Sequence, residues 1–222
     1  MNRARCLCGA VTWEIDVPLQ FMSHCHCSRC RKAHGAAFFT AVACAADHLR
    51  LAGDQHVVRW QSSPDWSRAF CGRCGSVVPG APFGGLVFLP AGNFEVDPGI
   101  RPTFHVFVAS KAPWYEIHDS LARFDAYPPG VDAPVMPDRP PLDPPGVGIR
   151  GSCLCGGISY VLQGKLLRCA NCHCGRCRKA YSAPHASNLI AAPEALRFTR
   201  CEELRVTYKV PDAKFFTHVF CC

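Results

Sequence analysis

The chain has 222 residues, of which 49% are hydrophobic and 18% charged, so its composition excludes wholesale disorder and allows one large or two smaller domains. The formal net charge is +7, but this figure counts the 17 cysteine thiols as neutral, so any thiolates would lower it. The remaining charge is modest, so we expect a solvated surface and disfavour a nucleic-acid partner.

Short apolar and alternating runs separated by Gly, Pro and Asp predict an all-β first half. The strands are expected at 11–16, 38–43, 56–60, 67–71, 86–89 and 103–108. The most apolar stretch, 36–46, is too short to cross a bilayer and predicts a buried strand, so no membrane segment is expected. A weak helical pattern covers 115–124.

Residues 128–148 are rich in proline and predict an extended linker. Strands are again expected beyond it, at 157–163, 204–210 and 215–221.

The octet Cys25–Lys32 recurs almost unchanged as Cys172–Lys179, and Cys6–Gly9 recurs as Cys153–Gly156 at the same offset. This internal repeat predicts two tandem domains, residues 1–127 and 149–222. The second domain is C-terminally incomplete, because it has no counterpart of Cys74 or of the chain from 75 to 127.

The 17 cysteines favour metal ligation over disulfides, because their number is odd and neighbours such as Cys6 and Cys8 are too close to pair. Met1–Arg5 carries no apolar export signal, which also favours a reducing, cytoplasmic location. Steps of the form Cys-x-Cys and Cys-x-x-Cys converge several sulfurs on one tetrahedral zinc.

Seven cysteines of the first half divide into one closed four-thiolate site and one open three-thiolate site. On a strand, Cys6 and Cys8 would share a face, and the turn from Cys71 to Cys74 would present two more sulfurs. We therefore assign the structural zinc to Cys6, Cys8, Cys71 and Cys74, and the catalytic site to Cys25, Cys27 and Cys30. In the second half the corresponding ligands are Cys153, Cys155 and Cys221, and Cys172, Cys174 and Cys177.

Alternative ligands stay open at this point. All zinc could be structural if Cys44 closed the second site. His26, and His173 in the second copy, are disfavoured because on a strand they would point away from the flanking cysteines. Cys44, Cys169 and Cys201 have no partner at ligand spacing and are interpreted as buried apolar residues.

Charged residues near the sites permit two interpretations each. Arg31 and Lys32 could attract and bind an anionic substrate, or could form a solvated face. His105, His118 and Asp119 could act as general acid or base, with a polar surface as the default interpretation.

The segments Cys6–Gly9, Cys25–Lys32 with Gly35, Phe70–Ser76 and Lys111–Trp114 resemble the glutathione-dependent formaldehyde-activating enzyme family. The resemblance implies a β-rich zinc fold of tent-like sheets, with structural zinc on the first and third cysteine groups and catalytic zinc on the middle triplet. The family's named activity condenses formaldehyde with glutathione to S-(hydroxymethyl)glutathione, which is carbon-sulfur lyase chemistry.

The resemblance implies an enzyme that uses a small thiol, glutathione foremost, and a small aldehyde. Because three anionic sulfurs weaken the Lewis acidity of zinc, delivery of the thiol is favoured over polarisation of the aldehyde. A non-enzymatic zinc module for protein or nucleic-acid partners is the alternative, and a metal or formaldehyde sensor is a third.

The second copy departs from the pattern: Ser182 replaces Gly35, the Lys-Ala-Pro-Trp element is missing, and Cys222 is a poor substitute ligand beside Cys221. We expect two zinc ions in the first domain and one or two in the second.

Overall fold

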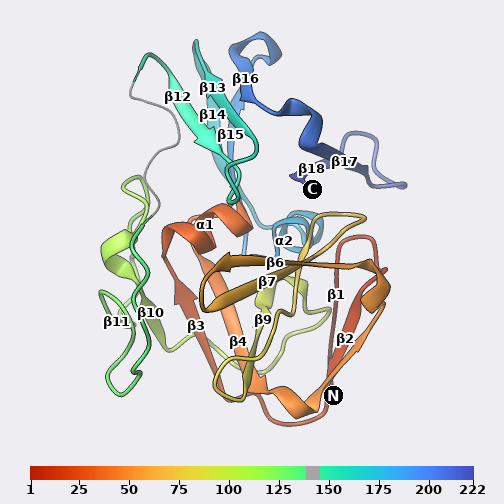
Figure 1. Cartoon of the computed structure of the whole chain (residues 1–222), viewed down its shortest axis with the longest axis vertical. Coiled ribbons are helices and arrows are strands. Elements are labelled where there is room, and N and C mark those ends of the chain that lie inside the picture. Colours follow the sequence, from red (N-terminus) through yellow and green to blue (C-terminus); the bar gives the residue numbers. More distant parts are fainter. Residues whose placement is uncertain (139–145) are drawn as a thin grey trace.

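A computed structural model describes residues 1–138 and 146–222 (Figure 1). The part of the predicted linker at 139–145 lies outside the described residues. Within these residues the chain is mainly β, as predicted, and it contains two short α-helices that the sequence pattern did not predict. Neither helix is long and apolar enough to span a membrane.

The strands and helices up to β11 form what we call the N-terminal unit. They are β1 (Asn2–Arg5), β2 (Thr12–Ile15), β3 (Phe21–Cys25), α1 (Ser28–His34), β4 (Phe39–Ala45), β5 (Leu49–Ala52), β6 (Val57–Ser63), β7 (Trp66–Cys71), β8 (Val77–Val78), β9 (Leu86–Pro90), β10 (Phe104–Val106) and β11 (Ala122–Arg123). They build three sheets, ordered β1-β2-β5, β11-β10-β3-β4-β9 and β6-β7-β8.

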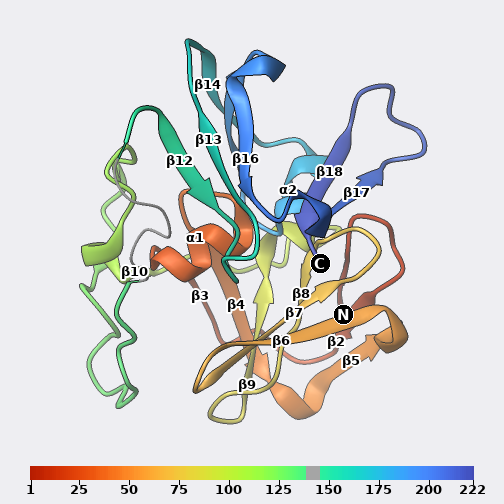
Figure 2. The same cartoon turned by 45° about the horizontal axis from the view of Figure 1, so that its top comes forward.

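The C-terminal unit repeats the first part of this order (Figure 2). Its elements are β12 (Ile149–Ser152), β13 (Ser159–Leu162), β14 (Leu166–Cys172), α2 (Gly175–Tyr181), β15 (Ala186–Ala191), β16 (Leu196–Arg200), β17 (Arg205–Lys209) and β18 (Thr217–Cys221). The sheets are β12-β13-β16, β14-β15 and β17-β18. Within the described residues, this unit has no counterparts of β8 to β11.

The main core lies inside the N-terminal unit, where Trp13, Val42 and Leu89 are fully buried. Strand β4 is buried along almost its whole length because β3 and β9 pair with its two edges. Its counterpart β15 pairs only with β14, and Leu189 and Ile190 on it are exposed. Among the described residues, β15 is therefore less covered than β4.

The two units are in contact, with α1 and α2 between them (Figure 1). The end of α2 is held by the N-terminal unit: Ser76 Oγ donates to Lys179 O at 2.8 Å, and His34 Nδ1 lies 3.0 Å from Tyr181 O. A further hydrogen bond between the units involves β18, where His218 Nδ1 lies 2.7 Å from Cys74 O. The hydrogen bonds join the helix end and the β17-β18 hairpin to one surface.

The prediction of a helix at 115–124 is wrong, because this stretch forms β11 and irregular chain instead. Phe124 N–H donates to His105 O, and Val108 N–H donates to Phe124 O, so sheet pairing satisfies its backbone. The strand expected at 103–108 ends at Val106, because Phe107 has a positive φ of 59°.

Both Cys-x-Cys segments differ from the expected strand geometry. Cys6 and Cys8 lie in a turn after β1, and Cys27 is the N-cap of α1. The short helices α1 and α2 escape detection because each has only seven residues, fewer than a periodic pattern needs.

Candidate metal centres

Four cysteine sulfurs of the N-terminal unit converge: those of Cys6, Cys8, Cys71 and Cys74 all lie within 4.8 Å of one another. The Cys6–Cys8 separation is 3.5 Å and the Cys8–Cys71 separation 3.7 Å. Tetrahedral zinc with Zn–S bonds of about 2.3 Å spaces its sulfurs by about 3.8 Å. The four thiols therefore fit a closed zinc site.

Two tight loops build this cluster. Cys6 N–H donates to Val11 O, and Gly75 N–H donates to Cys71 O. Gly9 and Gly75 take φ of +78° and +76°, a conformation that favours glycine. The loops thus bring the end of β1 to the end of β7.

Sulfur crowding disturbs the thiol pKa values of this cluster. The hydrogen bond from Cys6 lowers the pKa of Cys8 to about 7, and hydrogen bonding to Cys6 also lowers that of Cys74. Hydrogen bonding with Cys71 raises the pKa of Cys6. Thiols this close together cannot all lose their protons, because the resulting thiolates would repel one another. A bound cation would offset that repulsion.

The second cluster is the triplet Cys25, Cys27 and Cys30, whose sulfurs also lie within 4.8 Å of one another. Cys25 ends β3, Cys27 caps α1 and Cys30 lies in the first helical turn. Cys30 N–H donates to Cys27 Sγ at 3.3 Å, and Arg68 Nη2 donates to Cys30 Sγ at 3.5 Å. Three thiols fit zinc with one position left for another ligand.

Hydrogen bonds inside the triplet shift its pKa values in opposite directions. Cys27 raises the pKa of Cys25, whereas Cys25 and Cys27 together lower the pKa of Cys30. The positive charge of Arg68 favours the Cys30 thiolate further. Cys44 is buried in the main core and does not belong to the sulfur group.

A buried hydrogen-bond chain ends at the middle of the triplet. His26 Nε2 lies 2.8 Å from His105 Nδ1, and His105 Nε2 lies 3.0 Å from Asp119 Oδ1. Because the Asp119 carboxylate accepts, His105 carries its proton on Nε2, and its Nδ1 accepts from His26 Nε2. Burial also lowers the pKa of His26 to about 4, which keeps this ring neutral near pH 7.

The surface interpretation of His105 is wrong, since this side chain is only 1% exposed. Asp119 is half-exposed; burial raises the pKa of its carboxyl, but hydrogen bonds from His105 and the Leu121 N–H outweigh this and lower it. His118 is exposed, and its general acid or base role stays a prediction.

The main chain of His26 is held as firmly as its ring. Its N–H donates to Val106 O at 3.0 Å, and its carbonyl accepts from Arg31 Nε at 3.2 Å. Arg31 Nη2 also donates to Ser110 O, and Lys32 Nζ donates to Ser152 Oγ. The binding of an anionic substrate by Arg31 and Lys32 stays a prediction.

The C-terminal unit carries two more sulfur groups. Cys153, Cys155 and Cys221 lie within 4.8 Å of one another, with Cys153–Cys155 at 3.4 Å and Cys155–Cys221 at 3.6 Å. The triplet of Cys172, Cys174 and Cys177 meets the same limit. Cys222 does not belong to the former group.

Cys169 and Cys201 are exposed, so their interpretation as buried apolar residues is wrong. Cys169 lies on β14, whose outer edge has no neighbour in the described chain, and Cys201 lies in a turn with φ of 35°. Ser182 takes φ of 52°, close to the 51° of Gly35, and so accepts a left-handed conformation without glycine.

A family model described as glutathione-dependent formaldehyde-activating enzyme matches residues 1–110 and 148–222. No curated protein matches the chain. A crystal structure of a Rhodobacter sphaeroides protein is similar to it at 25% sequence identity, covering 44% of this chain and 92% of that chain, with a TM-score of 0.37.

Proposed function

Because the chain belongs to the glutathione-dependent formaldehyde-activating enzyme family, we propose that it adds a small thiol such as glutathione to formaldehyde or a related small aldehyde. The site of this reaction is the triplet Cys25, Cys27 and Cys30. The observation that supports the proposal is a convergent group of three sulfurs beside the guanidinium of Arg68, with no fourth cysteine in the group among the described residues.

The reaction forms one S–C bond between the thiol sulfur and the aldehyde carbon. The C=O bond becomes a C–OH bond, and the thiol proton ends on the oxygen. A zinc ion held by Cys25, Cys27 and Cys30 would favour the thiolate form of an entering thiol near neutral pH. The reverse direction is cleavage of a carbon-sulfur bond, so the activity is of the lyase type.

The chain's own residues orient this site. Arg68 places a positive charge 3.5 Å from Cys30 Sγ, which favours anionic sulfur at the triplet. The His26–His105–Asp119 chain and Arg31 fix the backbone between Cys25 and Cys27. A site held in this way can keep its open position in one place while a thiol enters.

The other sulfur groups complete the proposal. Cys6, Cys8, Cys71 and Cys74 hold a structural zinc, and the two triplets of the C-terminal unit hold up to two more. The tandem domains are residues 1–127 and 149–222, joined by 128–148, and the location is cytoplasmic.

Exchange spectroscopy with ¹³C-formaldehyde and glutathione tests the activity, because it separates catalysed from spontaneous adduct formation. We expect the zinc-loaded chain to accelerate exchange and Cys27→Ala to abolish the acceleration. Cys174→Ala, at the equivalent position of the second triplet, is the matched control and should keep most of it.

Zinc counting by native mass spectrometry accompanies this assay. Cys27→Ala should lose one zinc; retention of every zinc would refute the triplet as a metal site. If the wild type does not accelerate exchange and instead binds nucleic acid in a salt-sensitive way, the chain is the alternative non-enzymatic module.

A further inference from the structure

The large sheet β11-β10-β3-β4-β9 carries a row of aromatic rings on the face that also holds Cys25. Side chains alternate between the two faces along a strand, so Phe21 and Cys25 of β3 share one face. Phe21 aligns across β4 with Phe88 of β9, and the centroids of their rings are 6.2 Å apart. On its other side, the ring of Phe21 lies 5.8 Å from that of Phe104 on β10. All three rings are half-buried, so this apolar face is partly open to solvent.

The row of rings reaches the first triplet. Phe39 of β4 and Cys30 belong to one small apolar cluster, against which Phe88 packs. The β6-β7 hairpin adds another ring, since that of Trp66 lies 5.7 Å from that of Phe88. Two residues further along β7, Arg68 contacts the sulfur of Cys30. A ligand of the triplet is therefore adjacent to aromatic rings from β4, β7 and β9.

The cations beside this triplet make hydrogen bonds to the protein itself. Arg31 donates to two main-chain carbonyls, and Lys32 donates to Ser152 Oγ. Arg68 Nη2 donates to Cys30 Sγ. These bonds leave fewer donors for the carboxylates of glutathione, whereas the rings offer contact to an apolar body.

The second triplet has different surroundings, although its strands pair in the same register as those of the first. At the offset of the repeated octet, Arg168 stands where β3 has Phe21. Ala186 likewise stands where β4 has Phe39. Two aromatic rings of the first triplet's surroundings are therefore replaced by a cation and a methyl group.

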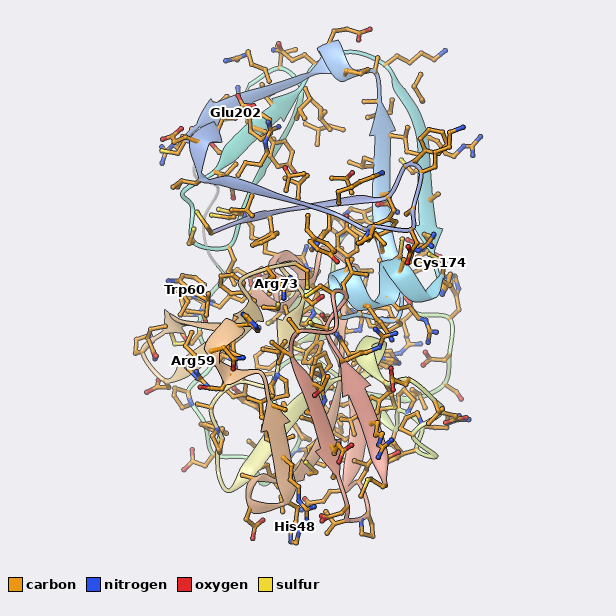
Figure 3. All side chains as sticks on the ribbon, turned by 90° about the vertical axis from the view of Figure 1, so that its right-hand side faces the viewer. His48, Arg59, Trp60, Arg73, Cys174 and Glu202 are labelled. Atoms are coloured by element: carbon orange, nitrogen blue, oxygen red, sulfur yellow. The ribbon has the colours of Figure 1, made fainter. Side chains whose placement is uncertain are left out.

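The β6-β7 hairpin also serves the first triplet alone. Trp60 of this hairpin and Cys174 of the second triplet lie on opposite sides of the view in Figure 3. Trp66, on the adjoining strand of the same hairpin, contacts a ring beside the first triplet and is remote from the second. The two triplets thus offer different walls to an entering thiol.

We propose that the first triplet selects a thiol with an aromatic or other apolar body over glutathione, and that the second triplet does not. The inference rests on the proposed function, in which a thiol enters the open position of a zinc ion held by Cys25, Cys27 and Cys30. On binding, the thiol proton passes to solvent and the sulfur forms a bond to the metal. Burial of the apolar body against the rings of β4, β7 and β9 supplies the preference.

Cadmium-113 NMR of the ¹¹³Cd-loaded full chain tests this selection without turnover, because each bound ion has its own resonance. Cys27→Ser identifies the resonance of the first triplet, and Cys174→Ser identifies that of the second. The wild type is titrated with benzyl mercaptan and, separately, with glutathione. At the first triplet, half-saturation should need about tenfold less benzyl mercaptan than glutathione. The second triplet should show no such preference.

Trp66→Ala removes the ring that the hairpin contributes. It should raise the half-saturating concentration of benzyl mercaptan at the first triplet about tenfold and leave that of glutathione within about twofold. Phe215→Ala is the matched control, because Phe215 is 84% exposed in the C-terminal unit, and it should change neither value.

The possible outcomes separate this proposal from the proposed function. Equal half-saturation by both thiols at the first triplet would overturn the selection and leave the proposed function standing. A preference of the same size at the second triplet would also overturn it, since the aromatic row would not be the cause. A first-triplet resonance that neither thiol moves would overturn both proposals. Absence of catalysed exchange together with a clear preference for benzyl mercaptan would refute the proposed function alone.

Discussion

His105 shows how a single buried side chain can act on a metal site that it does not touch. It bonds to His26 through one ring nitrogen and to Asp119 through the other, so it fixes the residue between Cys25 and Cys27. Residues that support a metal site in this way commonly change metal affinity by about 10–100-fold when they are replaced.

We predict that His105→Phe, which keeps the ring and removes both nitrogens, weakens zinc binding at the first triplet by about 10–100-fold. Competition with a chromophoric chelator measures the change. His118→Phe is the control, because His118 is exposed and should leave the affinity unaltered. An affinity unaffected by His105→Phe would mean that the hydrogen-bond chain does not support the triplet.

His34 lies at the contact between the units, where Nδ1 faces Tyr181 O and Nε2 is buried without a partner in the described chain. Burial lowers the pKa of His34 from 6.5 to about 4. The unfolded chain therefore takes up a proton near pH 6.5 that the folded chain refuses until about pH 4. The contribution of neutral His34 to the free energy of unfolding is fully present above pH 6.5, and it is lost as the pH falls toward 4.

We predict that His34→Asn, which keeps a donor to Tyr181 O, removes this pH dependence. Between pH 7 and pH 4 the wild type should lose up to about 3 kcal/mol more unfolding free energy than the variant. Urea unfolding of both zinc-loaded proteins at several pH values gives this difference. Acid also releases zinc, but it does so from both proteins, so its effect cancels when the two unfolding free energies are subtracted. A difference that stays constant with pH would contradict the prediction.

Among the elements, α2 depends on close approach to the N-terminal unit. Gly92, in the 3-10 turn Ala91–Asn93, lies against the end of this helix. A Cβ at Gly92 would clash with Ala183 O and lie 2.7 Å from Arg178 O, both of which are backbone atoms.

We predict that Gly92→Ala lowers the unfolding free energy by about 1–3 kcal/mol, because the two backbones must separate. Gly175→Ala, in the first turn of α2, is the control: an added Cβ there meets nothing within 4 Å. Its stability should stay within about 0.5 kcal/mol of the wild type. Denaturant unfolding measures both variants, and equal values would show that α2 does not pack closely at Gly92.

At the scale of the whole molecule, the two units share one order of strands but differ in how well their sulfur groups are enclosed. In the N-terminal unit, four thiols converge at the ends of β1 and β7, and most of them are buried. In the C-terminal unit, three thiols converge, and Cys155 is exposed.

We predict that a chelator removes zinc in two stages, from the C-terminal unit first and from Cys6, Cys8, Cys71 and Cys74 last. Buried ligands and a complete coordination shell slow attack on the closed cluster. Native mass spectrometry during the titration counts the ions. Cys74→Ser should move the last ion into the early stage, and loss of every ion in a single stage would refute the order.

Much of this architecture could be predicted because cysteine spacing and short apolar runs are local signals. The mainly β class and most expected strands are confirmed. The short helices were missed because seven residues are too few for a periodic pattern. Strand β11 was missed because the chain there pairs with a distant segment, as Phe124 does with His105. Apolar periodicity does not report such pairing.

The sequence by itself determined which cysteines could be ligands, since Cys6 and Cys8, Cys71 and Cys74, and the three cysteines of each octet are close along the chain. The octet Cys25–Lys32 occurs twice, which marks the same ligands in both copies. Only the tertiary structure decided what surrounds them. Burial of His105 and its bond to His26 depend on β10 lying parallel to β3, a pairing between residues about 80 positions apart. The two copies of the octet have nearly the same residues, so the surroundings of their sulfurs differ because of long-range packing. A local sequence pattern contains no information about such packing.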